Sequence, residues 1–159
     1  MVVLHNKADN NQTQVRIFMG EHTKVVPHEQ AGVIPYFIDR DILHTILITP
    51  KYFDDYWFFP KGNVEQGLTV CESAAKEAFE ECGVEGIIET HPFAAYQYEK
   101  YGKEYEVKLY LLEVTHIYNN WPESGERKRR ILTAENAVSV ISENSLKQIL
   151  ANLKNHLLS

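Results

Sequence analysis

The sequence predicts an α/β protein in which a mixed central sheet lies between layers of helices, as an α/β/α sandwich. β-rich runs recur along the chain, segments with helical apolar spacing lie among them, and no linker, repeat or low-complexity tract divides the chain. A chain of 159 residues with 44% apolar and 24% charged residues is ordinary for a soluble globular protein. We therefore expect one domain over residues 1–159.

The expected strands are short runs of β-branched, aromatic and aliphatic residues. Two of them, residues 31–38 and 42–49, are joined by a turn at Asp39-Arg40-Asp41. A short strand at residues 57–59 is stopped by Pro60, after which Lys61-Gly62-Asn63 turns the chain. The remaining candidates are residues 84–89, 93–98 and 105–115. The first 25 residues carry only weak signals.

Three helices are expected. Thr69 and Glu72 have the spacing of a capping box, and Gly83 occupies the position after a last turn that glycine favours, so a helix is predicted over residues 70–82. Thr133 can cap a second helix that runs through residue 141. The terminal helix is marked by an apolar stripe of Leu146, Ile149, Leu150, Leu153 and Leu157.

Three carboxylates lie close together on the first of these helices. Glu77, Glu80 and Glu81 share an arc of roughly 100° on its surface, where like charges repel one another. A hard divalent cation removes that repulsion by taking carboxylate oxygens as ligands. The alternative is a solvated acidic face, which is what most charge clusters are.

Residues 62–84 resemble a Nudix box. That pattern is a glycine, five residues, Glu, seven residues, Arg-Glu, an aliphatic residue, any residue, Glu-Glu, any residue, glycine and an aliphatic residue, and it fits without a gap. The resemblance implies the Nudix fold and metal-dependent hydrolysis of a phosphoanhydride bond in a nucleoside diphosphate linked to another moiety. It implies Mg²⁺, or Mn²⁺ as a substitute, held by Glu77, Glu80, Glu81 and the Lys61 carbonyl.

Two residues depart from the box. Leu68 stands where the family has Glu, and Lys76 where it has Arg. In the family this pair is thought to support the loop and helix through a charge interaction, so here the acidic partner is missing and Lys76 is left to pair with Glu72 or Glu80. The protein is therefore either an enzyme in which the loop and the helix are supported in a different way, or a non-catalytic ligand-binding domain.

A basic run follows later in the chain, Arg127-Lys128-Arg129-Arg130, after Trp121-Pro122-Glu123. It is either a solvated loop or a clamp in which Lys61, Arg127 and Arg129 hold phosphates, a role that suits the planar fork of arginine. The tract is similar to one in the diadenosine-polyphosphate and diphosphoinositol-polyphosphate branch of the family, although Ile131 replaces an expected tryptophan. That resemblance implies a phosphorylated small molecule, most plausibly a dinucleoside polyphosphate, as substrate; an RNA 5′-pyrophosphohydrolase is the alternative.

In this family a carboxylate from a later loop commonly completes the metal site. Glu126 is the preferred candidate because it directly precedes the basic run, with Glu123 next and Glu104 and Glu106 as alternatives. The tyrosines of the 96–105 region (Tyr96, Tyr98, Tyr101 and Tyr105) are either sheet and core aromatics or a base-stacking platform.

The remaining composition narrows the class of protein. A net charge of −6 argues against a general nucleic-acid binder, so RNA is considered as a substrate only. We expect neither a signal peptide nor a membrane span, since no stretch approaches ~20 apolar residues. Cys71 and Cys82 would lie roughly 16 Å apart along their helix, too far for a disulfide, so a reducing cytoplasm is the expected location.

Overall fold

The computed structural model describes residues 4–9, 12–17 and 26–158. Within them, nine strands form one mixed sheet in the order β2-β1-β7-β8-β3-β4-β9, and β5 and β6 pair with β3 and β8 respectively. The strands are β1 (Leu4–Asp9), β2 (Gln12–Ile17), β3 (His28–Asp39), β4 (Ile42–Ile48), β5 (Lys61–Asn63), β6 (Val84–Ile88), β7 (Ala94–Lys100), β8 (Lys103–Ile117) and β9 (Arg129–Thr133).

The centre of the sheet is the parallel pair of β3 and β8, in register from His28↔Tyr105 to Tyr36↔Glu113. Their middle residues are buried, as expected for strands that are covered on both faces and therefore read as continuous apolar runs. β5 pairs with the first half of β3 and β4 with its second half. The short strand β5 is thereby fixed beside the middle of the sheet.

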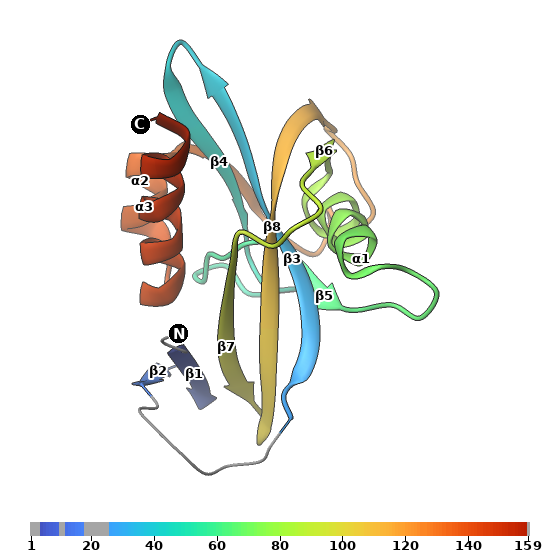
Figure 1. Cartoon of the computed structure of the whole chain (residues 1–159), viewed down its shortest axis with the longest axis vertical. Coiled ribbons are helices and arrows are strands. Elements are labelled where there is room, and N and C mark those ends of the chain that lie inside the picture. The colour runs from blue at the N-terminus through green and yellow to red at the C-terminus, as the bar shows by residue number, and fades with distance from the viewer. Residues whose placement is uncertain (1–3, 10–11, 18–25, 159) are drawn as a thin grey trace.

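Helices cover both faces of this sheet (Figure 1). On one face lies α1 (Val70–Glu77), continued by a π-helical turn η1 (Ala78–Cys82); on the other lie α2 (Ala134–Val140) and α3 (Asn144–Leu158). The terminal stripe is buried as predicted, with Leu146, Leu150 and Leu153 fully covered. The predicted α/β/α sandwich is confirmed. None of the described helices is long and apolar enough to cross a membrane.

The prediction of one regular helix over residues 70–82 is wrong in its second half. The α-helix ends at Glu77, and the next five residues form a π-helical turn before Gly83, which adopts the left-handed conformation (φ 66°) and caps it as expected. A π-turn displaces side chains from regular α-helical positions and is frequent at functional sites. Glu80 and Glu81 both lie in it.

Three other local predictions need correction. Residues 61–63, expected as a turn, are the strand β5, because they pair with β3 at Gly32↔Lys61. The strand expected at 57–59 is reduced to a single bridge between Phe58 and Ile48. The basic run is a loop only in its first half, since β9 begins at Arg129 and pairs with β4. Such long-range pairings leave little trace in local sequence.

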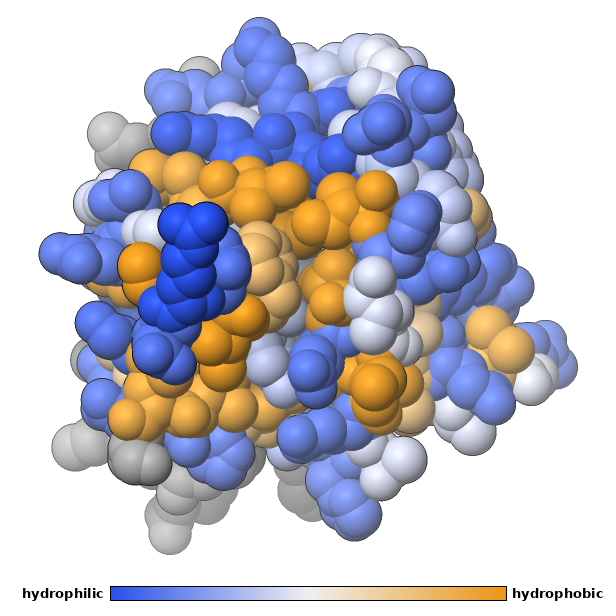
Figure 2. All heavy atoms as spheres, turned by 90° about the horizontal axis from the view of Figure 1, so that it is seen from above, coloured by the Kyte–Doolittle hydropathy of each residue, from blue (hydrophilic) through white to orange (hydrophobic). Residues whose placement is uncertain are grey.

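One end of the molecule is apolar. Figure 2 shows orange side chains gathered around a hollow at the end where the β3–β4 turn, β6 and the end of α3 lie in Figure 1. Exposed apolar residues of these elements are Ile38, Ile42, Ile87 and Leu158. This apolar end is formed by elements other than the helix that carries Glu77, Glu80 and Glu81.

Candidate active site

The helix that carries the three acids, α1 with its continuation η1, begins as the sequence predicts. The hydroxyl of Thr69 accepts a hydrogen bond from the Glu72 N–H (3.1 Å), and the Glu72 carboxylate accepts one from the Thr69 N–H (2.8 Å). These two bonds satisfy backbone donors that the first turn of a helix leaves unpaired. The capping box therefore fixes where α1 starts relative to β5.

Glu77 lies directly over the glycine that opens the box. A Cβ added to Gly62 would come within 2.3 Å of the Glu77 carboxyl carbon, so only glycine leaves room for this carboxylate. Burial, followed by the charges of Glu80 and Glu123, raises the pKa of Glu77. The loop and the helix thus bring one carboxylate against the backbone of β5.

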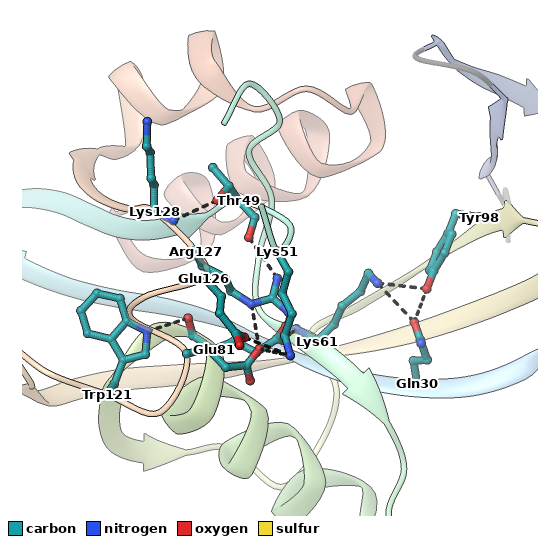
Figure 3. A network of polar contacts seen from close by, with 11 residues as sticks. Gln30, Thr49, Lys51, Lys61, Glu81, Tyr98, Trp121, Glu126, Arg127 and Lys128 are labelled. Atoms are coloured by element: carbon teal, nitrogen blue, oxygen red, sulfur yellow. Dashed lines mark hydrogen bonds and ion pairs between the residues drawn. The ribbon is translucent and has the colours of Figure 1, made fainter. Parts of the chain in front are cut away.

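Glu81 is the most buried of the three acids, with 4% of its surface exposed. Its Oε1 accepts a hydrogen bond from the Lys61 N–H (2.8 Å), and its Oε2 contacts Nη2 of Arg127 (2.5 Å). Burial raises the pKa of Glu81 to about 7, opposed by the positive charge of Arg127. Figure 3 shows Glu81 between these two partners.

Lys76 forms a brace between the loop and Glu80; its pair with Glu80 is one of the two that the sequence predicts, whereas its pair with Glu65 is not. Lys76 Nζ contacts Glu65 Oε2 (2.5 Å) and Glu80 Oε1 (3.6 Å), while Leu68 is exposed. The expectation that Lys76 has lost its acidic partner from the loop is therefore wrong. Glu65 supplies that partner from earlier in the same loop, which ties the loop to the helix without a carboxylate at position 68.

Residues 118–129, which run from the end of β8 to the first residue of β9, cap the end of the helix that carries the three acids. The carbonyl oxygens of residues 80–83 accept hydrogen bonds, in order, from the N–H of Glu123 (3.1 Å), Nε1 of Trp121 (3.0 Å), Nη1 of Arg129 (2.9 Å) and the N–H of Tyr118 (2.8 Å). A helix leaves its last carbonyls unpaired, and these four contacts pair them. The acidic turn and residues 118–129 thus form one connected unit.

Within the basic run of residues 127–130, Arg127 contacts the acids of the box. Besides Glu81, its guanidinium contacts Glu123 Oε1 through Nε (3.1 Å) and the Thr49 carbonyl through Nη1 (3.0 Å). Arg129 instead stacks over Trp121 (4.0 Å to the ring centroid) and donates to the Cys82 and Tyr118 carbonyls. These contacts give Arg129 a helix-capping position, so a phosphate-holding role for it stays a prediction.

The two candidates for a fourth ligand, Glu123 and Glu126, both contact the ammonium group of Lys51, but only one of them also contacts a partner of the three acids. Glu126, the preferred one, pairs with Lys51 (3.1 Å) and accepts a hydrogen bond from the Tyr52 hydroxyl (3.2 Å). Glu123 shares Arg127 with Glu81 and is close enough to raise the pKa of Glu77. The geometry thus brings Glu123, rather than Glu126, to the three acids, while the role of either in metal binding stays a prediction.

Lys61 divides its contacts between two places. Its backbone N–H belongs to the acidic site, whereas its ammonium group donates to the Tyr98 hydroxyl (2.9 Å) and the Gln30 side-chain oxygen (3.4 Å) (Figure 3). Burial lowers the pKa of Lys61 to about 8, partly offset by Glu81 and Glu143. Tyr98 in turn stacks on Tyr105 (4.9 Å between centroids). The predicted phosphate contact from Lys61 would require its ammonium group to leave these partners.

The donors at this site suit a hard divalent cation in kind. Glu77, Glu80 and Glu81 offer carboxylate oxygens, the ligands that Mg²⁺ and Mn²⁺ prefer. The arrangement is not preassembled, since residues 4–9, 12–17 and 26–158 contain no group of three His, Cys, Asp or Glu side chains placed to hold a metal. At Glu81 the charge is already balanced by Arg127.

Comparison with known proteins decides the family. The family model of the NUDIX domain matches residues 26–153. The chain belongs to the Nudix family. The predicted family is thereby confirmed.

Two Nudix relatives come from Arabidopsis thaliana. Nudix hydrolase 13, mitochondrial, is 33% identical over 132 residues, which cover 69% of this chain and 65% of that protein. Nudix hydrolase 12, mitochondrial, is 34% identical over 90 residues, which cover 52% and 44%. The matched part thus spans less than two thirds of each relative's length.

A third relative and a solved structure extend this picture. The diphosphoinositol polyphosphate phosphohydrolase 2 of Rattus norvegicus is 30% identical over 98 residues, covering 60% of this chain and 53% of that protein. The Ap4A hydrolase of C. elegans, solved as a binary complex, superposes with a TM-score of 0.68 at 22% identity, covering 82% of this chain and 97% of the other. At that identity the structural likeness shows the Nudix fold alone.

Two contacts at the candidate site of this Nudix domain were not predicted from the sequence. Glu65 precedes the box position it serves, and the Arg127–Glu81 pair joins distant segments. For Glu65 a signal existed, because it is an acid in the same loop as the missing box glutamate. No local pattern could have paired Arg127 with Glu81.

Proposed function

We propose that this protein hydrolyses a phosphoanhydride bond in a nucleoside diphosphate linked to another moiety, with Mg²⁺ as cofactor and Mn²⁺ as a substitute. The observation that carries the proposal is the convergence of the box acids on β5. Glu77 packs over Gly62, and Glu81 accepts a hydrogen bond from the Lys61 N–H. A site formed between the loop and the helix requires such contacts. Membership of the Nudix family supports it.

The acids would act both as ligands and as base. A cation held by Glu77, Glu80, Glu81 and the Lys61 carbonyl would offset phosphate charge and make a water molecule more acidic. One glutamate accepts the proton as the water oxygen bonds to phosphorus, and the bridging oxygen leaves with the electron pair of its bond to phosphorus.

The substrate we propose is a dinucleoside polyphosphate or a polyphosphorylated small molecule. Arg127 supports this, since it brings a bidentate phosphate donor to the acids. The names of the rat relative and of the C. elegans hydrolase refer to compounds of the same kind. An RNA 5′-end is a less suitable substrate for a chain of net charge −6. The main reason to consider a non-catalytic domain was the missing partner of Lys76 in the loop, and Glu65 is such a partner.

A substrate panel tests the proposal. Purified protein with Mg²⁺ is given diadenosine tetraphosphate, an inositol pyrophosphate, a nucleotide sugar and a 5′-triphosphate RNA, and the products are separated and quantified. We expect the first two to be hydrolysed with the highest catalytic efficiency. A clear preference for the RNA would replace the substrate class, and binding of a panel member without turnover would establish a non-catalytic domain.

We propose the cytoplasm as the location. Cys71 and Cys82 are both free thiols, as a reducing compartment favours. The two Arabidopsis relatives are named as mitochondrial, so fractionation of cells expressing the tagged protein separates the alternatives. Recovery in the mitochondrial fraction would overturn the assignment.

A further inference from the structure

Both oxygens of the most buried acid are occupied. Glu81 Oε1 is bonded to the Lys61 N–H and Oε2 to Arg127, and the surface exposure of the whole residue is 4%. A cation that takes Glu81 as a ligand therefore meets an arginine that already contacts Oε2. Figure 3 shows the guanidinium of Arg127 placed against Glu81.

Arg127 is held in that place by the rest of its surroundings. Its side chain is 10% exposed and its guanidinium also contacts Glu123 and the Thr49 carbonyl. The neighbouring backbone is fixed as well, since the Lys128 N–H donates to the Thr49 hydroxyl (2.9 Å) and the Thr49 N–H donates to the Lys128 carbonyl (3.1 Å). Arg127 is thus held in the acidic site by contacts other than the one with Glu81.

The negative charges of the site explain why Arg127 lies beside Glu81. The negative charges of Glu80 and Glu123 add to burial in raising the pKa of Glu77, and Glu77 in turn adds to burial in raising the pKa of Glu81. Buried carboxylates without a counter-charge are strongly unfavourable. Arg127 provides one positive charge, shared between Glu81 and Glu123.

We propose that Arg127 is the resident counter-ion of the metal-free site, and that a divalent cation binds by displacing its guanidinium from Glu81. The proposal rests on the proposed function in assuming that the cation is a ligand of Glu81. The released guanidinium becomes a donor to the substrate's phosphate, while the backbone beside it stays in place through the hydrogen bonds between Lys128 and Thr49. Metal binding and phosphate binding therefore reinforce each other, because each stabilises the arrangement in which Arg127 has left Glu81.

Competition between Arg127 and the cation for Glu81 lowers the apparent affinity for the cation by a measurable factor. If the paired arrangement accounts for about nine tenths of the metal-free molecules, the apparent affinity for the cation is lowered about tenfold. The variant Arg127→Gln removes the competitor, so its affinity for Mn²⁺, measured without substrate by the spin-resonance signal of the free ion, should be about tenfold tighter than that of the wild type. An unchanged or weaker affinity overturns the proposal.

Lys128→Gln is the matched control. It removes the same charge one residue further along, but its ammonium group pairs with Asp54 (3.1 Å) on the exposed surface. We expect its Mn²⁺ affinity to stay within about twofold of wild type, since exposed charges are largely screened. Equal tightening in both variants would mean that general charge, and not displacement, sets the affinity, and would also overturn the proposal.

A measurement on the wild-type protein covers the case in which Arg127→Gln does not fold. The side-chain Nε–H resonance of Arg127, assigned by its loss in Arg127→Lys, is followed while Mg²⁺ is added. Displacement predicts a shift that saturates with Mg²⁺ binding, and an unmoved resonance at saturation contradicts it. Neither readout depends on turnover, so an inactive protein that shows displacement would refute the proposed function and leave this inference standing.

Discussion

Gly62 offers a perturbation that moves one carboxylate without removing it. An alanine Cβ at this position would lie 2.3 Å from the Glu77 carboxyl carbon, whereas ordinary contact begins at 3.4 Å, so the carboxylate must retreat by 3.4 − 2.3 = 1.1 Å. Gly62 has no positive φ, so its backbone accepts alanine. Because the obstructing atoms are the end of a flexible side chain, the fold should absorb the change.

The expected result is a folded protein with impaired chemistry. A displacement of about 1 Å in a catalytic group costs about 10²-fold in rate, so kcat of Gly62→Ala should fall by about that factor. Gly125→Ala is the control, because a Cβ there meets nothing within 4 Å, and it should leave kcat unchanged. The assay is steady-state hydrolysis of the best substrate of the panel, with thermal unfolding measured on the same samples.

Two outcomes refute this reasoning. A folded Gly62→Ala protein with wild-type kcat would show that turnover does not need Glu77 at its observed position over Gly62. A Gly62→Ala protein that does not fold would show that the side chain of Glu77 cannot move away, so that the backbone of the loop has to shift instead.

Further predictions concern the brace, the buried acid and the basic loop. Glu65→Gln should lower the midpoint of thermal unfolding by a few degrees at most, and Leu68→Glu should restore it by giving Lys76 a new partner; no rescue would refute the brace. For metal-free protein, the pKa of Glu81 rises on folding from 4.5 to about 7, so the stability contributed by its protonated form is complete below pH 4.5 and is lost as the pH rises through 7. Urea unfolding with a chelator should show a loss of about 3 kcal/mol from this residue, absent in Glu81→Gln. Arg127→Ala should cost about 10- to 150-fold in kcat/KM on a polyphosphate substrate and little on a nucleotide sugar, whereas Arg129→Ala should affect both equally because Arg129 caps the helix.

Features set by neighbouring residues could be predicted from the sequence. The capping box of Thr69 and Glu72, the left-handed Gly83 and the cap at Thr133 all follow from local rules, and each is observed. The same is true of the buried stripe on α3. These elements fixed the layers of the sandwich and the place of the box.

Features set by distant partners could not. The strand β5 exists because Gly32 and its neighbours pair with it, and the π-turn of Ala78–Cys82 has no local signature. The carbonyls that end this turn are paired by a loop from far along the chain. The pair of Arg127 and Glu81 likewise depends on that loop docking beside Thr49, which only the assembled fold reveals.

The central claim is that the carboxylates of the box, together with a divalent cation, cleave a phosphoanhydride. The most direct measurement is kcat of wild type and Glu80→Gln on the best substrate of the panel, with Mg²⁺ and with an excess of chelator. The account predicts turnover by the wild type that the chelator abolishes, and a loss of at least about 10²-fold in Glu80→Gln, since the substitution keeps the size and removes the charge of a ligand. Turnover that survives the chelator, or a Glu80→Gln protein as active as wild type, would contradict it.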